Sequence, residues 1–181
     1  NEEAFDIYRN TFKEFGLGVE TEIDLPVESL GYTSNNKAPG LLLDFVMGQY
    51  DTYTAIQLSQ YISTIANGGS RLQPHLLKEV HAATDDDSLG DVIYTFETNV
   101  LNTVNTKPEY LNRVKEGLYA VTHKSYGLGR EYIDDSHDPS GKTGTSQSAK
   151  DTDGDHVNDT DTVSTAFVGY APSSSPKMSI T

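Results

Sequence analysis

The sequence predicts an α+β domain, because segments with helical spacing and segments with strand patterning are mixed along the chain. Apolar residues recur every three or four positions near residues 5, 58 and 111, whereas other segments alternate or are rich in β-branched residues. The 181 residues contain no internal repeat and no linker. A chain of this length can bury one hydrophobic core, which favours a single unit.

The first helix is expected from residue 1 or 2 to about residue 15, where Gly16 follows as a helix-stopping residue. Four aromatic residues recur in it at helical spacing: Phe5, Tyr8, Phe12 and Phe15. This helix has no cap and no initiator methionine, and residues 177–181 alternate like a strand and stop where their apolar side chains would need partners. The sequence therefore predicts an interior fragment of a longer protein.

The second helix is expected to begin with a capping box, in which Thr54 and Gln57 satisfy each other's backbone N–H groups. The Asn-Gly-Gly sequence at 67–69 is expected to end it, because these residues tolerate a left-handed backbone. Its apolar stripe consists of Leu58, Tyr61, Ile62 and Ile65. Such a stripe indicates packing against the core.

The third helix is expected to begin with a second capping box, formed by Thr106 and Glu109, with Pro108 in its first turn. Its apolar stripe consists of Leu111, Val114, Leu118 and Val121. Four further segments are predicted to be strands: 72–80, 91–96, 142–148 and 162–170. Residues 84–88, with the sequence TDDDS, are expected to form a polar turn.

Composition excludes several classes of function. The chain has 13 basic and 27 acidic residues, and the resulting net charge of −14 argues against a nucleic-acid partner. No run of 18 apolar residues predicts a membrane span, and nothing at the start resembles a signal peptide. The absence of cysteine excludes disulfides and thiolate catalysis, and it fits an oxidising location outside the cytoplasm.

The stretch PSGKTGTSQS at 139–148 matches parts of two different motifs. A Walker A loop needs glycine five residues before the glycine of GKT, and that position is Ser136. It also needs a following helix to hold phosphate, whereas small residues alternate here as in a strand. Two interpretations remain. One is the K-T-G motif of serine acyl-transfer enzymes, and the other is an ordinary exposed strand with a solvated lysine.

The other segments of the chain favour the K-T-G interpretation. The relevant sequences are EFGLG at 14–18, IDLP at 23–26, MGQY at 47–50, QLSQY at 57–61, IANGG at 65–69, Pro74, GLYAV at 117–121 and SGKTGT at 140–145. In this order and spacing, nearly the whole chain resembles the C-terminal half of the transpeptidase domain of class B penicillin-binding proteins. The resemblance implies an antiparallel sheet flanked by helices, as in serine β-lactamases and transpeptidases.

That family also uses an S-x-x-K motif, which carries the nucleophilic serine, and an S-x-N motif. Ser34 with Lys37 and Ser174 with Lys177 match S-x-x-K by letter, and residues 34–36 match S-x-N. Neither serine fits the role of the nucleophile, because that serine and its lysine should share one face of a helix. Ser34 lies in a Gly/Asn/Pro-rich segment, and Pro176 interrupts the spacer between Ser174 and Lys177. By resemblance, residues 1–181 are a partial domain whose nucleophile-bearing half lies upstream.

The resemblance implies that Lys142 is catalytic, because its charge would face the carboxylate of the leaving D-alanine and the proton-relay serine. The substrate-binding residues it implies are Thr143, Gly144, Thr145, Ser146 and Gln147. The hydroxyl groups of Thr143 and Thr145 would bind the same carboxylate, and the N–H of Thr145 would form half of the oxyanion hole. Gly144 would let the substrate lie against the backbone.

The implied activity is a peptidoglycan D,D-transpeptidase that acts through a serine acyl-enzyme, without a cofactor, and is the target of β-lactams. The expected partners are peptidoglycan stem peptides, β-lactam antibiotics and the N-terminal half of the same protein. The expected location is the extracytoplasmic face of the membrane, with an N-terminal anchor. The alternatives are an extracellular calcium-dependent binding module and a β-lactam-sensing receptor or carboxypeptidase of related fold.

An aspartate-rich segment at 151–161 follows the K-T-G strand. Oxygen ligands at its first, third, fifth and ninth positions resemble a calcium loop, and they are Asp151, Asp153, Asp155 and Asp159. The match to an EF-hand is imperfect, because the sixth position is His156 rather than glycine and the twelfth is Thr162 rather than glutamate. A calcium site and a solvated acidic loop both remain open.

Overall fold

The computed structural model of the chain describes residues 2–86 and 88–181. Its helices are α1 (Glu2–Glu14), α2 (Leu41–Val46), α3 (Ala55–Ala66), α4 (Pro108–His123) and the 3-10 turn η1 (Asp135–His137). Its strands are β1 (Ser70–Leu72), β2 (Glu79–His81), β3 (Val92–Thr95), β4 (Val100–Thr103), β5 (Ser140–Lys150), β6 (Thr160–Ala171) and β7 (Met178–Ile180). The fold is α+β with antiparallel pairing, as predicted. Asp87, part of the predicted polar turn, lies outside the described residues.

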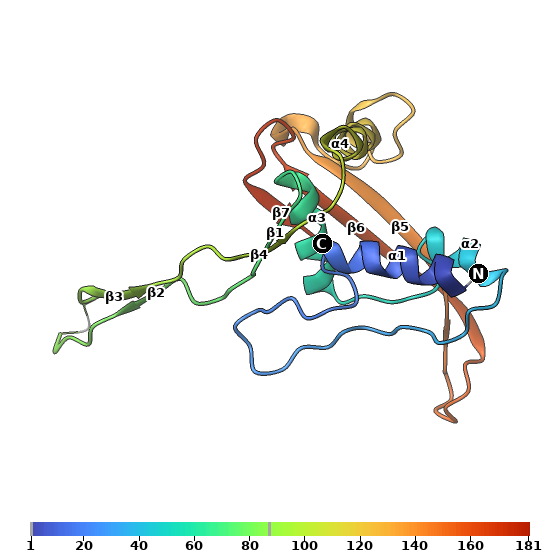
Figure 1. The fold of residues 1–181 in the computed structure, drawn as a ribbon, viewed down its shortest axis with the longest axis horizontal. Helices are drawn as coiled ribbons and strands as arrows, with labels where there is room; N and C mark the ends of the chain where they lie inside the picture. The colour runs from blue at the N-terminus through green and yellow to red at the C-terminus, as the bar shows by residue number, and fades with distance from the viewer. Residues whose placement is uncertain (1, 87) are drawn as a thin grey trace.

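The main sheet has the strand order β5-β6-β7 (Figure 1). β5 and β6 pair antiparallel along their whole length, from Ser140 opposite Tyr170 to Lys150 opposite Thr160. β7 pairs with the end of β6, which confirms the strand expected at 177–181. Among the described residues no strand pairs with the outer edge of β5, so this edge stays open.

The core forms where α3 packs against β6. Ile62, Ile65 and Ala66 of α3 are buried against Tyr170, and Phe15, Tyr61, Leu118 and Val168 pack around them. The predicted capping box is confirmed, since Gln57 N donates to Thr54 Oγ1 at 3.3 Å and Thr54 N donates to Gln57 Oε1 at 3.1 Å. α3 therefore holds the sheet in contact with α4 and with Phe15, the residue that follows α1, through one cluster of apolar side chains.

The predicted first helix is confirmed as α1, and its aromatic face packs on α2. Phe5 is fully buried and stacks on Phe45, with ring centroids 5.5 Å apart. Phe12 contacts the same ring at 5.3 Å. α2 was not predicted, because a helix of six residues is too short to display a helical period. It nevertheless contributes Phe45, around which the aromatic cluster is built.

The capping box predicted at Thr106 and Glu109 is wrong, although the helix itself is confirmed as α4. The helix begins at Pro108, and Lys107 occupies the capping position without a side-chain hydrogen bond. Proline has no N–H to cap and its φ is already helical, so it sets the first position. The predicted apolar stripe of this helix is only partly buried, because Leu111 is buried whereas the Val114 side chain is 45% exposed.

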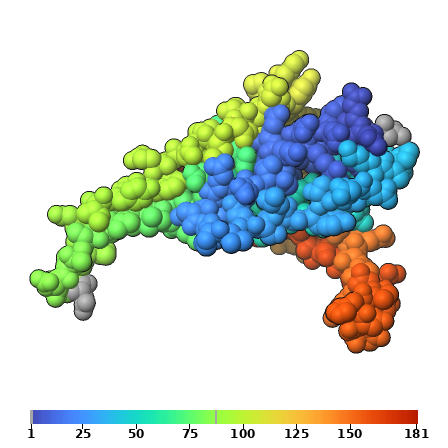
Figure 2. Space-filling model, turned by 60° about the horizontal axis from the view of Figure 1, so that its bottom comes forward, coloured from blue at the N-terminus to red at the C-terminus, as the bar shows by residue number. Residues whose placement is uncertain are grey.

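The single strand predicted at 72–80 is wrong. β1 ends at Leu72 and pairs with β4, whereas β2 begins at Glu79 and pairs with β3 in a separate ribbon. Pro74 lies between β1 and β2, and because proline has no N–H it cannot donate a hydrogen bond to a neighbouring strand. β2, β3 and the described residues between them form an arm that projects from the body (Figures 1 and 2). The strand predicted at 91–96 is confirmed as β3.

The two strands predicted around the K-T-G stretch are confirmed, and both are longer than predicted. β5 runs to Lys150 and β6 starts at Thr160, so their far ends form a hairpin that extends beyond the body (Figure 2). None of the helices in the described part of the chain has the length and apolar character needed to cross a membrane.

Candidate functional site

All six predicted residues of the K-T-G site lie side by side on β5. Side chains alternate along a strand, so Lys142, Gly144 and Ser146 share one face, and Thr143, Thr145 and Gln147 share the other. The register places Lys142 opposite Val168, whose side chain packs on the core. The lysine face of β5 is therefore continuous with the face that α3 covers farther along the sheet.

The open edge of β5 presents backbone groups of alternate residues. Gln147 N donates to Gln49 Oε1 at 3.2 Å and not to β6. In an antiparallel strand the N–H and C=O of one residue point to the same side and the side alternates. Thr143 and Thr145 therefore direct their backbone groups to the open edge as well. Such an edge can accept an extended peptide as an added strand.

The Lys142 side chain forms a hydrogen bond at this open edge. Its ammonium group donates to the backbone oxygen of Thr143, with Nζ and O 2.6 Å apart, and its side chain is exposed. The bond holds the charge beside the threonine whose hydroxyl was predicted to bind a carboxylate. An anionic ligand placed along the edge would meet this ammonium group beside the backbone of Thr143, while the Thr143 and Thr145 side chains extend from the other face of the strand.

The two glycines of the SGKTG stretch have different surroundings. A Cβ on Gly141 would lie 2.7 Å from Val168 O and would also overlap the Phe167 ring, so Gly141 is required by packing within the sheet. A Cβ on Gly144 would lie 3.8 Å from the Cβ of Ala166, an ordinary contact. Packing among the described residues does not explain Gly144, which leaves close approach of a ligand as its predicted reason.

A cavity lies between α4 and the K-T-G strand. Its volume is about 370 Å³, and Gly117, Ala120, Tyr126 and Leu128 line it together with Lys142 and Thr143. α4 and the loop that follows it thus form one wall beside the lysine. The opening is large enough for a small group, and it lies beside the residues that the sequence analysis singled out.

Neither serine of the two S-x-x-K matches lies in a helix. The backbone of Ser34 is bound to Arg9 and Asp51, while Lys37 Nζ bonds to Asp6 Oδ1 at 2.8 Å. Ser174 lies in a bend, where its N–H donates to Asp138 Oδ2 at 3.2 Å. The geometry agrees with the expectation that neither serine is paired with its lysine as a nucleophile would be.

The aspartate-rich segment forms the turn of the β5–β6 hairpin. Carboxylate oxygens of Asp151, Asp153 and Asp159 lie within 4.8 Å of one another, whereas Asp155 is not part of this group. Asp151 accepts the N–H groups of Gly154 at 2.7 Å and His156 at 2.8 Å. These bonds lower the pKa of Asp151. The loop therefore supplies part of the compensation for its own carboxylates.

The carboxylate of Asp159 is compensated in the same way. It accepts bonds from the Thr152 hydroxyl at 2.7 and 2.8 Å and from the Thr160 hydroxyl at 2.9 Å. The Thr152 and Thr160 bonds lower the pKa of Asp159. Asp153 accepts the N–H of Asp155 at 3.2 Å, and Asp155 accepts the N–H of Val157 at 2.7 Å. All four predicted calcium ligands are thus already engaged by donors of the loop itself.

One residue at the site had no predicted role. Gln49 belongs to the MGQY segment, yet nothing in its local sequence indicated contact with a strand 98 residues away. The only available signal was that MGQY is among the segments that carry the family resemblance. Its contact with β5 depends on tertiary structure, which spacing along the chain does not encode.

Comparisons with known proteins identify the family to which this chain belongs. The family model described as penicillin binding protein transpeptidase domain matches residues 5–181. Penicillin-binding protein 2A of Bacillus subtilis is 45% identical over 177 residues, covering 98% of this chain and 25% of the relative. Penicillin-binding protein H of the same organism is 42% identical over 171 residues, covering 94% of this chain and 24% of the relative.

A solved structure shows the same fold. Penicillin-binding protein 2B of Streptococcus pneumoniae superposes with a TM-score of 0.86 at 35% identity, and the match covers 99% of this chain and 28% of that chain. This chain therefore spans about a quarter of the length of the relatives it matches.

Proposed function

Since the chain belongs to the transpeptidase domain family of class B penicillin-binding proteins, we propose that it is part of a peptidoglycan D,D-transpeptidase that cross-links stem peptides. The observation that carries the proposal is the K-T-G sequence on an exposed strand with an open edge, beside a cavity under α4. The chain covers 25% of its relative from Bacillus subtilis, so the activity would belong to the larger protein.

The proposed reaction is acyl transfer through a serine. The serine oxygen bonds to the carbonyl carbon of the D-alanyl-D-alanine bond, and the terminal D-alanine leaves with a proton. An amine of a neighbouring peptidoglycan strand then attacks the ester, which releases the serine with its proton restored. The residues of β5 would hold the donor peptide during both steps.

In this reaction Lys142 would attract the carboxylate of the leaving D-alanine, and the hydroxyls of Thr143 and Thr145 would donate to it. The N–H of Thr145 faces the open edge of β5, where it could stabilise the oxyanion. β-Lactams carry a carboxylate beside a strained amide, so they would bind the same groups and acylate the serine. Stem peptides and β-lactams are therefore the proposed ligands.

We place the nucleophile outside these 181 residues. Support comes from Ser34 and Ser174, neither of which shares a helix face with its lysine. The proposed partner is the N-terminal part of the same protein, and the proposed location is the extracytoplasmic face of the membrane, where peptidoglycan is cross-linked. The proposed chemistry uses no cofactor.

The full-length protein provides the test. It should react covalently with a fluorescent penicillin and should release D-alanine from a synthetic stem pentapeptide. Peptide mapping should find the label on a serine outside residues 1–181 of this chain. A protein that forms no covalent adduct and releases no D-alanine would contradict the proposal.

A further inference from the structure

Gln49 contacts the K-T-G strand at a defined point of its open edge. Its side-chain oxygen Oε1 accepts the backbone N–H of Gln147 at 3.2 Å. Thr143, Thr145 and Gln147 are successive residues whose backbone groups face that edge. The Gln49 side chain therefore occupies the third position of the row, immediately after the two threonines.

This contact lies where β5 leaves the body of the molecule. From Gln147 to Lys150 the side chains of β5 are exposed, and β6 is exposed opposite them from Thr160 to Asp161. A two-stranded ribbon is only marginally stable without further packing. A bond from the body to Gln147 therefore limits movement of the ribbon just beyond the threonines.

The backbone at Gln49 is fixed by a hydrogen bond of its own N–H and by the contacts of the next residue, Tyr50. Its N–H donates to Asp44 O at 2.8 Å, at the end of α2. The next residue, Tyr50, packs its ring against Phe5 at 5.7 Å and Phe45 at 6.0 Å, and its hydroxyl donates to Asn36 O. These contacts fix the backbone from which the Gln49 side chain extends.

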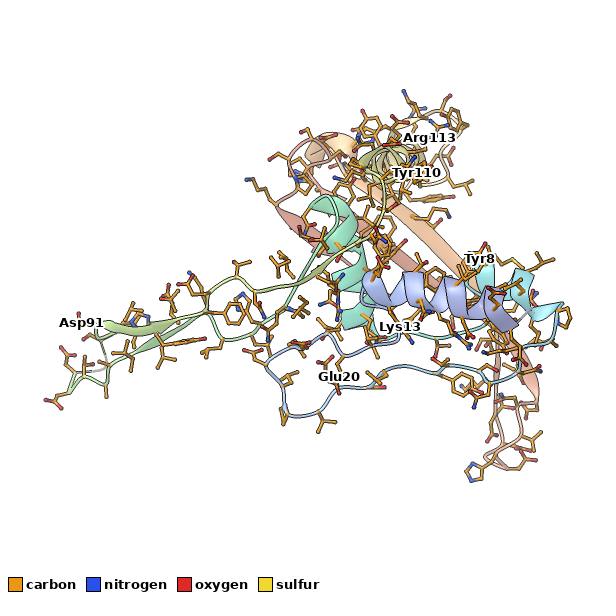
Figure 3. All side chains as sticks on the ribbon, viewed as in Figure 1. Tyr8, Lys13, Glu20, Asp91, Tyr110 and Arg113 are labelled. Atoms are coloured by element: carbon orange, nitrogen blue, oxygen red, sulfur yellow. The ribbon has the colours of Figure 1, made fainter. Side chains whose placement is uncertain are left out.

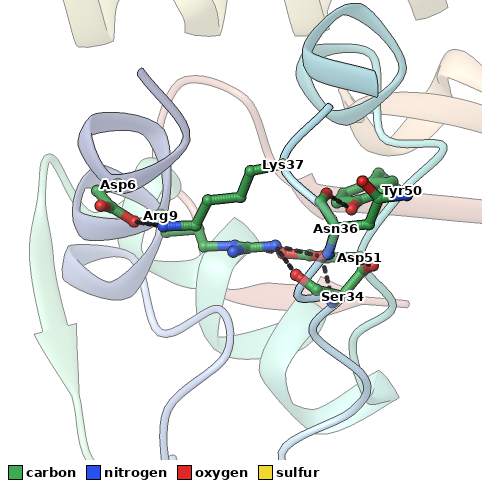
Figure 4. A network of polar contacts seen from close by, with 7 residues as sticks. All are labelled: Asp6, Arg9, Ser34, Asn36, Lys37, Tyr50 and Asp51. Carbon is green, nitrogen blue, oxygen red and sulfur yellow. Dashed lines mark hydrogen bonds and ion pairs between the residues drawn. The ribbon is translucent and has the colours of Figure 1, made fainter. Parts of the chain in front are cut away.

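Asp51, two residues after Gln49, attaches the same segment to α1 and to Ser34 (Figure 4). The Arg9 guanidinium forms two bonds to the Asp51 carboxylate, both 3.0 Å long, and Arg9 also donates to Ser34 O at 2.8 Å. The Asp51 side chain is 3% exposed, so water competes little for these bonds. The network connects α1, the 33–37 loop and the segment that carries Gln49.

We propose that Gln49 is a positioning residue for acyl transfer. Its carboxamide holds β5 at Gln147, which keeps the backbone groups of Thr143 and Thr145 in place for an extended donor peptide. It also occupies the next backbone donor, so the added peptide strand ends before Gln147. This inference rests on the proposed function of β5 and assigns a role to a residue outside the K-T-G motif.

The test uses the full-length protein and two variants. Gln49→Met keeps the length of the side chain and removes the acceptor oxygen, whereas Gln49→Glu retains an acceptor oxygen. We expect Gln49→Met to lower the maximal acylation rate with a fluorescent penicillin about 10-fold, because the reacting groups lose alignment. Gln49→Glu should react at close to the wild-type rate.

A second measurement separates positioning from general loss of structure. Hydrogen exchange at the Gln147 amide should accelerate in Gln49→Met, while the amides of Ser146 and Ser148, which face β6, should keep wild-type exchange. The control is Met47→Ala, which changes an exposed side chain of the same segment and should leave both rate and exchange unchanged.

Two results would overturn the inference. The first is that Gln49→Met keeps the wild-type acylation rate and the wild-type hydrogen exchange at the Gln147 amide. The second is that Gln49→Glu is acylated as slowly as Gln49→Met. Failure of the proposed function would look different, because the wild-type protein itself would then form no adduct and release no D-alanine. The wild-type reaction thus distinguishes the two failures.

Discussion

Lys142 shows how the motif acts at the level of one residue. Its ammonium group has no carboxylate partner among the described residues and instead bonds to the neighbouring Thr143 O. A charge-assisted bond to an incoming carboxylate is stronger than a bond to a neutral carbonyl oxygen. The lysine is therefore able to exchange a bond to a neutral oxygen for a bond to a negatively charged one when an anionic ligand arrives.

We predict that Lys142→Ala in the full-length protein slows acylation by a fluorescent penicillin by about 10²-fold or more, since an electrostatic stabiliser of the transition state is lost. The matched control is Lys150→Ala, which removes the same type of side chain from the exposed far end of β5. It should react at the wild-type rate. Unchanged kinetics in a folded Lys142→Ala variant would contradict the assigned role.

The Arg9–Asp51 pair contributes at the residue scale to stability. The two side chains are 13% and 3% exposed, and the hydrogen bond with Asp51 raises the pKa of Arg9. We predict that Arg9→Met lowers the free energy of unfolding of the domain by about 3–5 kcal/mol, because the buried carboxylate loses its partner.

The double variant Arg9→Met with Asp51→Leu is the control for that prediction. Replacing both charges by apolar groups removes the stranded carboxylate, so it should cost less than the single change. Denaturant unfolding measures the double variant and the two single variants, Arg9→Met and Asp51→Leu. A double variant that is as unstable as the sum of the two single variants would show that the pair has no special coupling.

At the scale of elements, Asp24 ties the loop before α2 to the base of the arm. Its carboxylate accepts the N–H groups of Leu76 at 2.7 Å and Leu77 at 2.8 Å, and the bonds from Leu77 and Leu76 lower its pKa below the ordinary 3.8. A folded-state pKa below the unfolded value means that the attachment is fully present above pH 3.8 and is lost as the pH falls through the lower value.

We therefore predict that the attachment is independent of pH near neutrality and weakens only in acid. Hydrogen exchange of the Leu76 and Leu77 amides, corrected for the intrinsic pH dependence, should lose protection below pH 3.8. Asp24→Ala should show the same loss at pH 7. Protection that is equal in wild type and Asp24→Ala at neutral pH would refute the role of Asp24.

The acidic turn of the β5–β6 hairpin leads to a different prediction. Donors within the loop already engage Asp151 and Asp159, and Asp155 lies apart from the other carboxylates. A cation would have to displace these bonds, so we predict that millimolar calcium leaves the melting temperature of the protein unchanged.

Thermal unfolding with increasing calcium tests this prediction, and Asp153→Ala is the control. A rise in melting temperature with calcium that disappears in Asp153→Ala would establish a metal site. In that case the loop would stiffen one end of the β5 ribbon, without taking part in acyl transfer itself.

Local signals predicted the elements whose formation is local. The capping box and apolar stripe of α3 involve neighbours within one helix, and both were confirmed. β1 and β2 were fused into one prediction because their separation depends on different partner strands: β1 pairs with the distant β4, whereas β2 pairs with β3 in its own hairpin. The same reason applies to the site: the sequence identified 142–147, but Gln49 meets β5 only through the fold.

At the scale of the whole molecule, the chain has a packed body and two projections. The arm, which carries Asp91 in Figure 3, and the acidic hairpin extend from the body in different directions (Figures 2 and 3). The K-T-G residues lie between the body and the hairpin, where α4 forms one wall.

The proposed division of the active site leads to the last prediction. If the serine nucleophile lies in another part of the protein, the 181-residue chain produced alone should form no covalent adduct with a fluorescent penicillin, while the full-length protein should. Within the chain, Lys37 is bound to Asp6, and Ser174 lies in a bend, so neither serine has an activating lysine on a shared helix face. Intact mass spectrometry after incubation measures the outcome, with circular dichroism to verify that the chain is folded. An adduct on Ser34 or Ser174 would show that the chain carries its own nucleophile.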